Sequence, residues 1–174
     1  MRDALLQGLR RPLTEAAPGA DDPELAALAA TVEEASERTL GRSLAIRHVD
    51  AGSCNGCELE IHALNNAFYD IERFGFRFVA SPRHADVLLV TGPVTLNMRE
   101  ALLRTYAATP APKWVVASGA CAANGGAFAG SYAVANGVAA VLPVDLVIPG
   151  CPPSPAALMK GLLALMRGGS RGRD

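Results

Sequence analysis

From Ser43 onward, the chain alternates short apolar runs with longer stretches of helical periodicity. This alternation is typical of strands and helices that follow one another through a parallel sheet. The runs Val87-Leu-Leu-Val90 and Trp114-Val-Val116 are apolar at every position, as expected of strands buried on both faces. The sequence therefore predicts an α/β fold built on an open parallel sheet, with helices on both faces in a flavodoxin-like arrangement.

One hydrophobic core is expected, because 174 residues, half of them hydrophobic, suffice for one well-buried domain and are short for two. Asp22-Pro23 and Gly41 are start and stop signals for an earlier helix, Glu24–Leu40. The strands of the main domain are predicted at Leu44–Val49, Phe76–Ala80, Asp86–Thr91, Trp114–Ser118 and Asp145–Ile148. Its helices are predicted at Cys57–Asp70, Leu96–Ala107, Tyr132–Val138 and Ser154–Met166.

The four cysteines of the chain all follow predicted strands. Cys54 and Cys57 come after the first strand, Cys121 after the fourth and Cys151 after the fifth. Because the carboxyl ends of parallel strands share one edge of the sheet, the four thiols are expected to converge there. Each has a glycine within two residues, which lets the backbone approach a bulky inorganic centre. We therefore predict a metal site at this edge, with Gly92-Pro93 in its wall.

The cysteine spacing leaves several chemistries open. An iron–sulfur cluster fits best, because it takes four thiolates, tolerates irregular spacing and is an anion that a helix N-terminus stabilises. Structural zinc usually uses two close pairs, whereas one pair and two single cysteines occur here. A thioredoxin-like dithiol would use Cys54 and Cys57 alone. Structural disulfides are disfavoured by the lack of an export signal.

Charge and hydropathy exclude other classes of function. The formal charge is −1, from 16 basic and 17 acidic residues without a basic run, which argues against a nucleic-acid partner. No apolar run has the length of a transmembrane helix, and the N-terminus lacks the apolar core of a secretory signal. We expect a soluble, cytoplasmic protein.

Residues 1–43 differ in pattern from the rest. Leu5, Leu6, Leu9 and Leu13 share a helical face beside arginines, which suggests an arm that contacts a membrane subunit near anionic headgroups. The expected organisation is an N-terminal arm and helix at 1–43, an iron–sulfur-binding α/β domain at 44–168 and a flexible tail at 169–174.

Five segments, in the same order, resemble one family. They are Ser53-Cys-Asn-Gly-Cys-Glu-Leu-Glu60, Ser81-Pro-Arg-His-Ala-Asp86, Thr91-Gly-Pro-Val-Thr95, Gly119-Ala-Cys121 and Ile148-Pro-Gly-Cys-Pro-Pro153. The family is the small electron-transfer subunit shared by membrane-bound group 4 nickel–iron hydrogenases, including formate hydrogenlyase, and by respiratory complex I. Complex I has two adjacent cysteines at the first site, so the separated pair here resembles the hydrogenase branch.

The resemblance implies that Cys54, Cys57, Cys121 and Cys151 hold one 4Fe-4S cluster beside the active site of a larger partner. The chain would be a non-catalytic electron relay in a membrane-associated hydrogenase complex, peripheral on the cytoplasmic face of the inner membrane. Its implied partners are a large catalytic subunit, a ferredoxin-like iron–sulfur subunit and integral-membrane subunits. The alternative is the equivalent subunit of a complex I-like, quinone-linked or ion-translocating oxidoreductase without a nickel–iron site.

Other residues near these motifs have plainer interpretations as well. Glu58 and Glu60 are expected in the first helical turn, where carboxylates complement the helix dipole. Relatives resemble this chain at Glu60, which suggests proton transfer there. Arg83 is a candidate for holding the partner or an anionic neighbour, and His84 for the solvated surface. The aromatic residues Trp114, Phe74, Phe76 and Phe78 are expected in the core.

Overall fold

The computed structural model describes residues 42–167 and has a five-stranded sheet in the order β2-β1-β3-β4-β5. All four strand pairs are parallel. The predicted flavodoxin-like α/β fold is therefore confirmed, and every predicted strand exists, with bounds that differ by no more than two residues. The strands are β1 (Leu44–Asp50), β2 (Phe76–Phe78), β3 (Val87–Thr91), β4 (Trp114–Ser118) and β5 (Leu146–Ile148).

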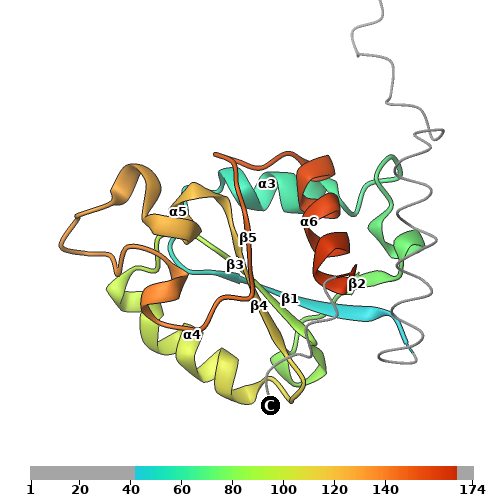
Figure 1. Cartoon of the computed structure of the whole chain (residues 1–174), viewed down its shortest axis with the longest axis horizontal. Helices are drawn as coiled ribbons and strands as arrows, with labels where there is room; N and C mark the ends of the chain where they lie inside the picture. The colour runs from blue at the N-terminus through green and yellow to red at the C-terminus, as the bar shows by residue number, and fades with distance from the viewer. Residues whose placement is uncertain (1–41, 168–174) are drawn as a thin grey trace, which may run out of the picture.

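Helices cover both faces of the sheet (Figure 1). On one face α3 (Gly56–Ala63) and α6 (Pro155–Arg167) enclose a core that includes Ile61, Leu158 and Leu162. On the other face α4 (Leu96–Ala108) and α5 (Gly119–Asn124) cover a second core around Leu88, Leu102 and Val115. Both faces of the sheet are thus buried, which leaves the ends of its strands as the place for a functional site.

The central strands and aromatic residues are buried as predicted. Every residue of β3 and of β4 is buried. Trp114, Phe74 and Phe76 are no more than 5% exposed, and Phe78 packs, partly buried, against the same core.

The predicted helix Cys57–Asp70 is wrong in its second half, because α3 ends at Ala63. The Asn66 side chain accepts hydrogen bonds from the amides of Phe68 and Tyr69, each at 2.9 Å. Asparagine stabilises such turns in competition with the helix. A short 3-10 helix, Ile71–Phe74, then leads into β2.

The predicted helix Tyr132–Val138 is also wrong. This segment is irregular and is held by backbone bonds to the loop after β3: Ala133 accepts from Leu96, and Ala135 donates to Val94. Val134 bridges Thr95 in antiparallel fashion. The apolar spacing that suggested a helix arises because Ala135 and Val138, three residues apart, both pack in the core beneath α4. Only Val138–Ala140 forms a 3-10 turn.

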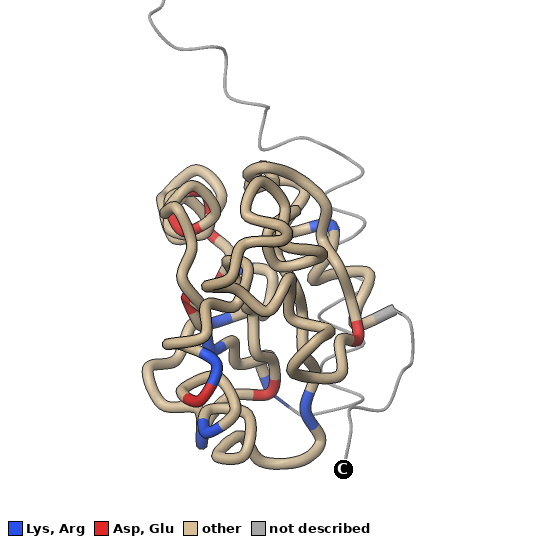
Figure 2. The backbone as a smooth tube through the Cα atoms, turned by 90° about the vertical axis from the view of Figure 1, so that its left-hand side faces the viewer, with Lys and Arg blue, Asp and Glu red and all other residues tan. Residues whose placement is uncertain are grey.

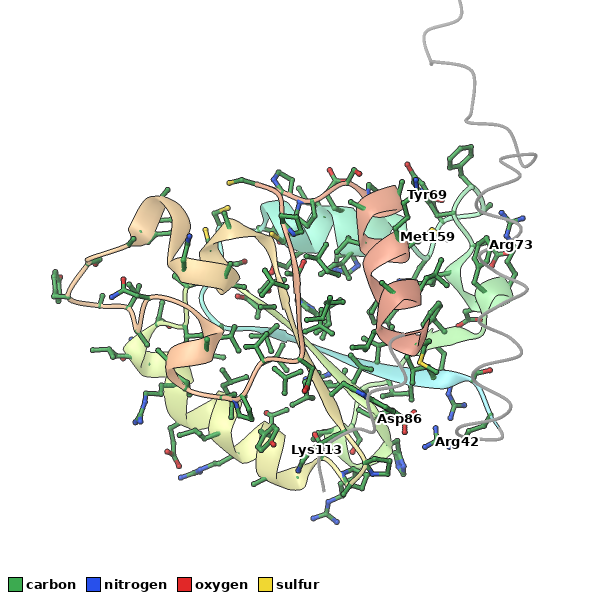
Figure 3. All side chains as sticks on the ribbon, in the orientation of Figure 1. Arg42, Tyr69, Arg73, Asp86, Lys113 and Met159 are labelled. Carbon is green, nitrogen blue, oxygen red and sulfur yellow. The ribbon has the colours of Figure 1, made fainter. Side chains whose placement is uncertain are left out.

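Arg42 is attached to the domain by an ion pair that Figure 3 shows near the start of β1. Its guanidinium donates two hydrogen bonds, of 2.8 and 2.6 Å, to the carboxylate of buried Asp86. Asp86 also accepts the amide of Ala45 at 2.9 Å. The predicted arm, the helix Glu24–Leu40 and the tail at 169–174 lie outside the described residues. Within the described range, no helix is long and apolar enough to cross a bilayer.

Candidate metal centre

The first cysteine loop is a tight turn held by the end of β1. Oδ1 of Asp50 accepts the amides of Gly52 and Ser53, both at 2.8 Å. The Ser53 hydroxyl accepts the amide of Asn55 at 3.0 Å, and Asn55 takes a left-handed conformation just before α3. As a result Cys54 is exposed on the turn, while Cys57, the second residue of α3, is half-buried.

The other two cysteine loops are bonded to each other. The amide of Ala120 donates to the carbonyl of Gly150 at 2.7 Å, which places the loop after β4 beside the loop after β5. Cys121, within α5, is half-buried, and Cys151 is exposed. The backbone amide of Ala127 donates to the Cys121 sulfur and lowers its pKa, although burial raises that pKa by more.

Two glycines leave room for the sulfur atoms. A Cβ at Gly119 would lie 2.8 Å from Sγ of Cys57, and a Cβ at Gly126 would lie 2.9 Å from Sγ of Cys121. Both glycines have positive φ, at +88° and +50°. The Cys57 thiol faces the carbonyl of Ser118 at 3.8 Å. The sulfurs therefore occupy space that any other residue at positions 119 and 126 would fill.

The electrostatics of Cys57 include the other three thiols. Burial first, and then the charges of Glu58, Cys121, Cys54 and Cys151 in that order, raise the pKa of Cys57 to about 11. Four thiolates repel one another at this edge unless a cation binds them. Binding of iron would release the thiol protons, because ligation requires the thiolate form.

The donor set fits an iron–sulfur group. All four thiols are free of disulfides, and thiolates are the soft ligands that such clusters take. The glycine-lined space beside Cys57 and Cys121 admits a bulky inorganic group. In residues 42–167 the His, Cys, Asp and Glu side chains form no group of three that could hold a metal ion. The fit therefore rests on the thiols and their glycine surroundings, not on a preformed single-ion site.

The loop after β3 forms part of the wall of this edge, as predicted from Gly92-Pro93. A Cβ at Gly92 would lie 2.7 Å from the backbone nitrogen of Ser53, so the two loops are in close contact. The amide of Thr95 donates to the carbonyl of Ala51 at 2.8 Å. The loop after β3 thus packs against the turn that carries Cys54 and supports it.

Beneath α3 lies a polar side chain, Glu58, whose burial was not predicted from the sequence. Glu58 is only 5% exposed, and its Oε1 lies 3.6 Å from Nε2 of His48. That ring nitrogen is 3.1 Å from the hydroxyl of buried Thr91, and burial lowers the pKa of His48 from its ordinary value of 6.5. The sequence held one signal for this buried polar group. His48 lies two residues after Ile46 on β1, and therefore on the same face of the strand.

Two further predicted residues, Glu60 and Arg83, interact less with the cysteine thiols than Glu58 does. The expectation that Glu60 stands in the first turn of α3 is wrong, since only Glu58 does, and Glu60 is half-exposed in the second turn. Arg83 and His84 are exposed in a 3-10 helix, Pro82–His84, before β3. They are therefore at the amino-terminal edge of the sheet, opposite the cysteines.

The family model for "NADH ubiquinone oxidoreductase, 20 Kd subunit" matches residues 54–165, a range that contains all four cysteines. The chain belongs to this family. Formate hydrogenlyase subunit 7 of Escherichia coli, strain K12, is 48% identical over 124 residues, which are 71% of this chain and 49% of that protein. The chain therefore matches about half the length of that relative.

Two further comparisons place this member of the 20-kDa-subunit family. The probable membrane-bound hydrogenase subunit mbhJ of Pyrococcus furiosus is also 48% identical over 124 residues, 71% of this chain and 74% of that protein. A chain in the structure of the membrane-bound sulfane sulfur reductase, an archaeal respiratory membrane complex, is 36% identical with a TM-score of 0.66. The alignment covers 80% of this chain and 78% of that one.

A more distant likeness concerns the fold. A chain of the NAD⁺-reducing [NiFe]-hydrogenase aligns with 76% of this 20-kDa-type subunit and 96% of its own length, with a TM-score of 0.57 and 20% identity. The parallel sheet with helices on both faces is shared with that oxidoreductase subunit. The named relatives are parts of hydrogenases or of a membrane-bound respiratory complex.

Proposed function

We propose that this chain is the electron-relay subunit of a membrane-associated hydrogenase complex of the formate hydrogenlyase type. Cys54, Cys57, Cys121 and Cys151 would each bind one iron of a single 4Fe-4S cluster. Such a cluster, once bound, accepts and releases one electron at a time. The chain itself would be non-catalytic: its loops hold the group and restrict the access of water, and no bond of a substrate is made or broken on it.

The observation that supports the proposal is the placement of four free cysteines, with glycines against two of their sulfurs, at the carboxyl ends of parallel strands. Three segments far apart in the sequence carry them, and a hydrogen bond joins two of these segments. The 48% identity to subunits named as parts of formate hydrogenlyase and of a membrane-bound hydrogenase supports a hydrogenase as the setting.

Exposed apolar side chains around the same edge support a large subunit as the partner. Leu59 follows Cys57 and is 63% exposed, Leu96 begins α4 and is 55% exposed, and Tyr132 is 95% exposed. Their exposure is explained if a permanent partner covers them, and such interfaces are typically on the order of 2,000 Å² or more. We propose that a large catalytic subunit docks here, because a relay has to lie close to the active site that it serves.

The remaining placements follow from the same proposal. A ferredoxin-like iron–sulfur subunit would exchange electrons with this chain, and integral-membrane subunits would hold the complex at the cytoplasmic face of the inner membrane. The leucine-lined arm of residues 1–43 would contact those membrane subunits. Glu60 stays a candidate for proton transfer at the partner's interface, since it is half-exposed beside the cysteine pair.

Exposure of the complex to hydrogen gas tests this function. The complex would be purified anaerobically through a tag on its large subunit, oxidised and placed under hydrogen while its paramagnetic resonance spectrum is recorded. Each hydrogen molecule gives two protons and two electrons at the partner's metal site, so a reduced-cluster signal should appear. Substitution Cys121→Ala should abolish that signal. A cluster that hydrogen leaves oxidised would contradict the proposal.

A second candidate is the equivalent subunit of a complex I-like oxidoreductase without a nickel–iron site. The family's own name and the 36% identity to a chain of a sulfane sulfur reductase complex support it. In that case hydrogen would leave the cluster oxidised, whereas a reduced pyridine nucleotide or ferredoxin supplied to the whole complex would reduce it. Two Cys-x-x-Cys pairs in the neighbouring large subunit would favour hydrogenase, and their absence the second candidate.

A further inference from the structure

Glu58 is an unusual neighbour for a site of four thiols. It follows Cys57 directly in α3 and is 5% exposed. Both of its carboxylate oxygens are buried, and neither has a hydrogen-bond partner in the part of the chain that the structure describes. Burial of a carboxylate without partners is costly, so a function that depends on its presence has to be considered.

The one basic group close to Glu58 does not neutralise it. Nε2 of His48 lies 3.6 Å from Oε1 of Glu58 and 3.1 Å from the hydroxyl of Thr91. Burial lowers the pKa of His48 by more than the charges of Glu58 and Asp50 raise it, and Arg47 and His62 lower it further. The ring is therefore uncharged at neutral pH and brings no positive charge to the carboxylate of Glu58.

The segments around the thiols contain no permanent cation. Residues 48–72, 87–98 and 114–159 include all three cysteine loops and the loop after β3, and none of them contains Lys or Arg. Figure 2 marks the Lys and Arg positions of the described chain in blue, and the sequence places every one of them outside these segments. Arg47 is nearest in sequence, but it alternates with His48 along β1 and so faces the other side of the sheet.

We propose that the buried carboxylate of Glu58 keeps the reduction potential of the group held by Cys57 low. This inference rests on the proposed function, since it requires a redox group at the four thiols. Reduction adds one electron and no proton to an anionic group, so a fixed negative charge nearby disfavours it, most strongly where water is excluded. Glu58 also opposes the positive N-terminus of α3, which would favour reduction. A lower potential makes the reduced group a stronger electron donor.

Redox titration of the anaerobically purified complex, monitored by paramagnetic resonance, tests the proposal. Glu58→Gln keeps the shape and removes the charge, so the equilibrium constant for reduction should rise roughly tenfold or more, about 59 mV for a one-electron couple. Glu58→Asp restores the charge and should return the midpoint potential toward that of the wild type. Glu60→Gln is the matched control on the same helix, and water around this half-exposed side chain should keep its effect well below that of Glu58→Gln.

Equal midpoint potentials for Glu58→Gln, Glu60→Gln and the wild type would overturn the proposal. If Glu58→Gln loses iron, His48→Lys places a cation against the intact carboxylate. The same rise in midpoint potential is then required, and its absence would also reject the role of Glu58. Failure of the proposed function looks different, because the wild-type complex itself would then contain no iron and give no titratable signal.

Discussion

Gly119 and Cys57 are in contact although they belong to different helices, α5 and α3: a Cβ at Gly119 would lie 2.8 Å from the Cys57 sulfur. Gly119 also has a φ of +88°, a conformation that side chains rarely adopt. The end of β4 therefore determines where the thiol of α3 can lie. The geometry of the four-thiol edge depends on this glycine as much as on the cysteines.

Replacement Gly119→Ala is expected to abolish metal incorporation while the chain still folds. The new methyl group displaces the Cys57 sulfur, and the positive φ adds a strain of about 1 kcal/mol. Gly130→Ala is the matched control, since Gly130 has a φ of +79° with no atom within 4 Å of the added Cβ. Iron content of the purified complex provides the measurement. Equal iron loss in both variants would show that backbone strain, not the contact with Cys57, is responsible.

Removal of the Arg42 side chain should destabilise the start of the sheet. Arg42→Ala removes two hydrogen bonds from the buried carboxylate of Asp86 and, among the described residues, leaves it the amide of Ala45, which costs about 1–3 kcal/mol. Hydrogen exchange of the β1 and β3 amides in the assembled complex should accelerate accordingly. Arg104→Ala is the control, because its pair with Glu100 is exposed and contributes roughly 0.5 kcal/mol or less. Unchanged protection of β1 in Arg42→Ala would contradict the assignment.

The stability of the metal-free chain should fall below about pH 6.5, partly because of His48. Its pKa is lower in the folded chain than the ordinary 6.5, so the unfolded chain binds the proton more tightly. Stability is then fully present above 6.5 and is lost as pH falls through the folded pKa.

His48→Gln should flatten this dependence in urea unfolding of the metal-free chain. His84→Gln, an exposed position in the 3-10 helix Pro82–His84, should leave it unchanged. A variant at His48 that keeps the full pH dependence would show that other groups cause it.

The fold was predictable because its signals are local and repeated. The apolar runs of β3 and β4 have no alternation, and this identified buried parallel strands. The edge shared by the cysteines then followed from topology alone. The wrong helices had specific causes: the turn at Asn66 depends on a side-chain bond, and residues 132–138 are irregular and bridge Thr95 through Val134. Neither long-range pairing nor side-chain capping can be read from periodicity.

The sequence predicted the thiols of the candidate site but not the buried polar side chains next to them. Glu58 and Glu60 look equivalent in sequence, two residues apart behind Cys57, yet only Glu58 is buried. The difference arises because α3 turns Glu58 toward the sheet, where His48 on β1 and Thr91 on β3 form a polar layer beneath it. Which side of a short helix faces the sheet depends on tertiary packing, so the pattern could not separate the two and the resemblance favoured Glu60.

Iron and sulfide analysis of the complex, made anaerobically with its large subunit, tests the central claim most directly. This account predicts about four irons and four acid-labile sulfides for the Cys54, Cys57, Cys121 and Cys151 site, with loss of that increment in Cys151→Ala. The reduced wild type should give a paramagnetic signal that this variant lacks. One zinc per chain bound by these cysteines, with no iron or sulfide lost on substitution, would contradict it.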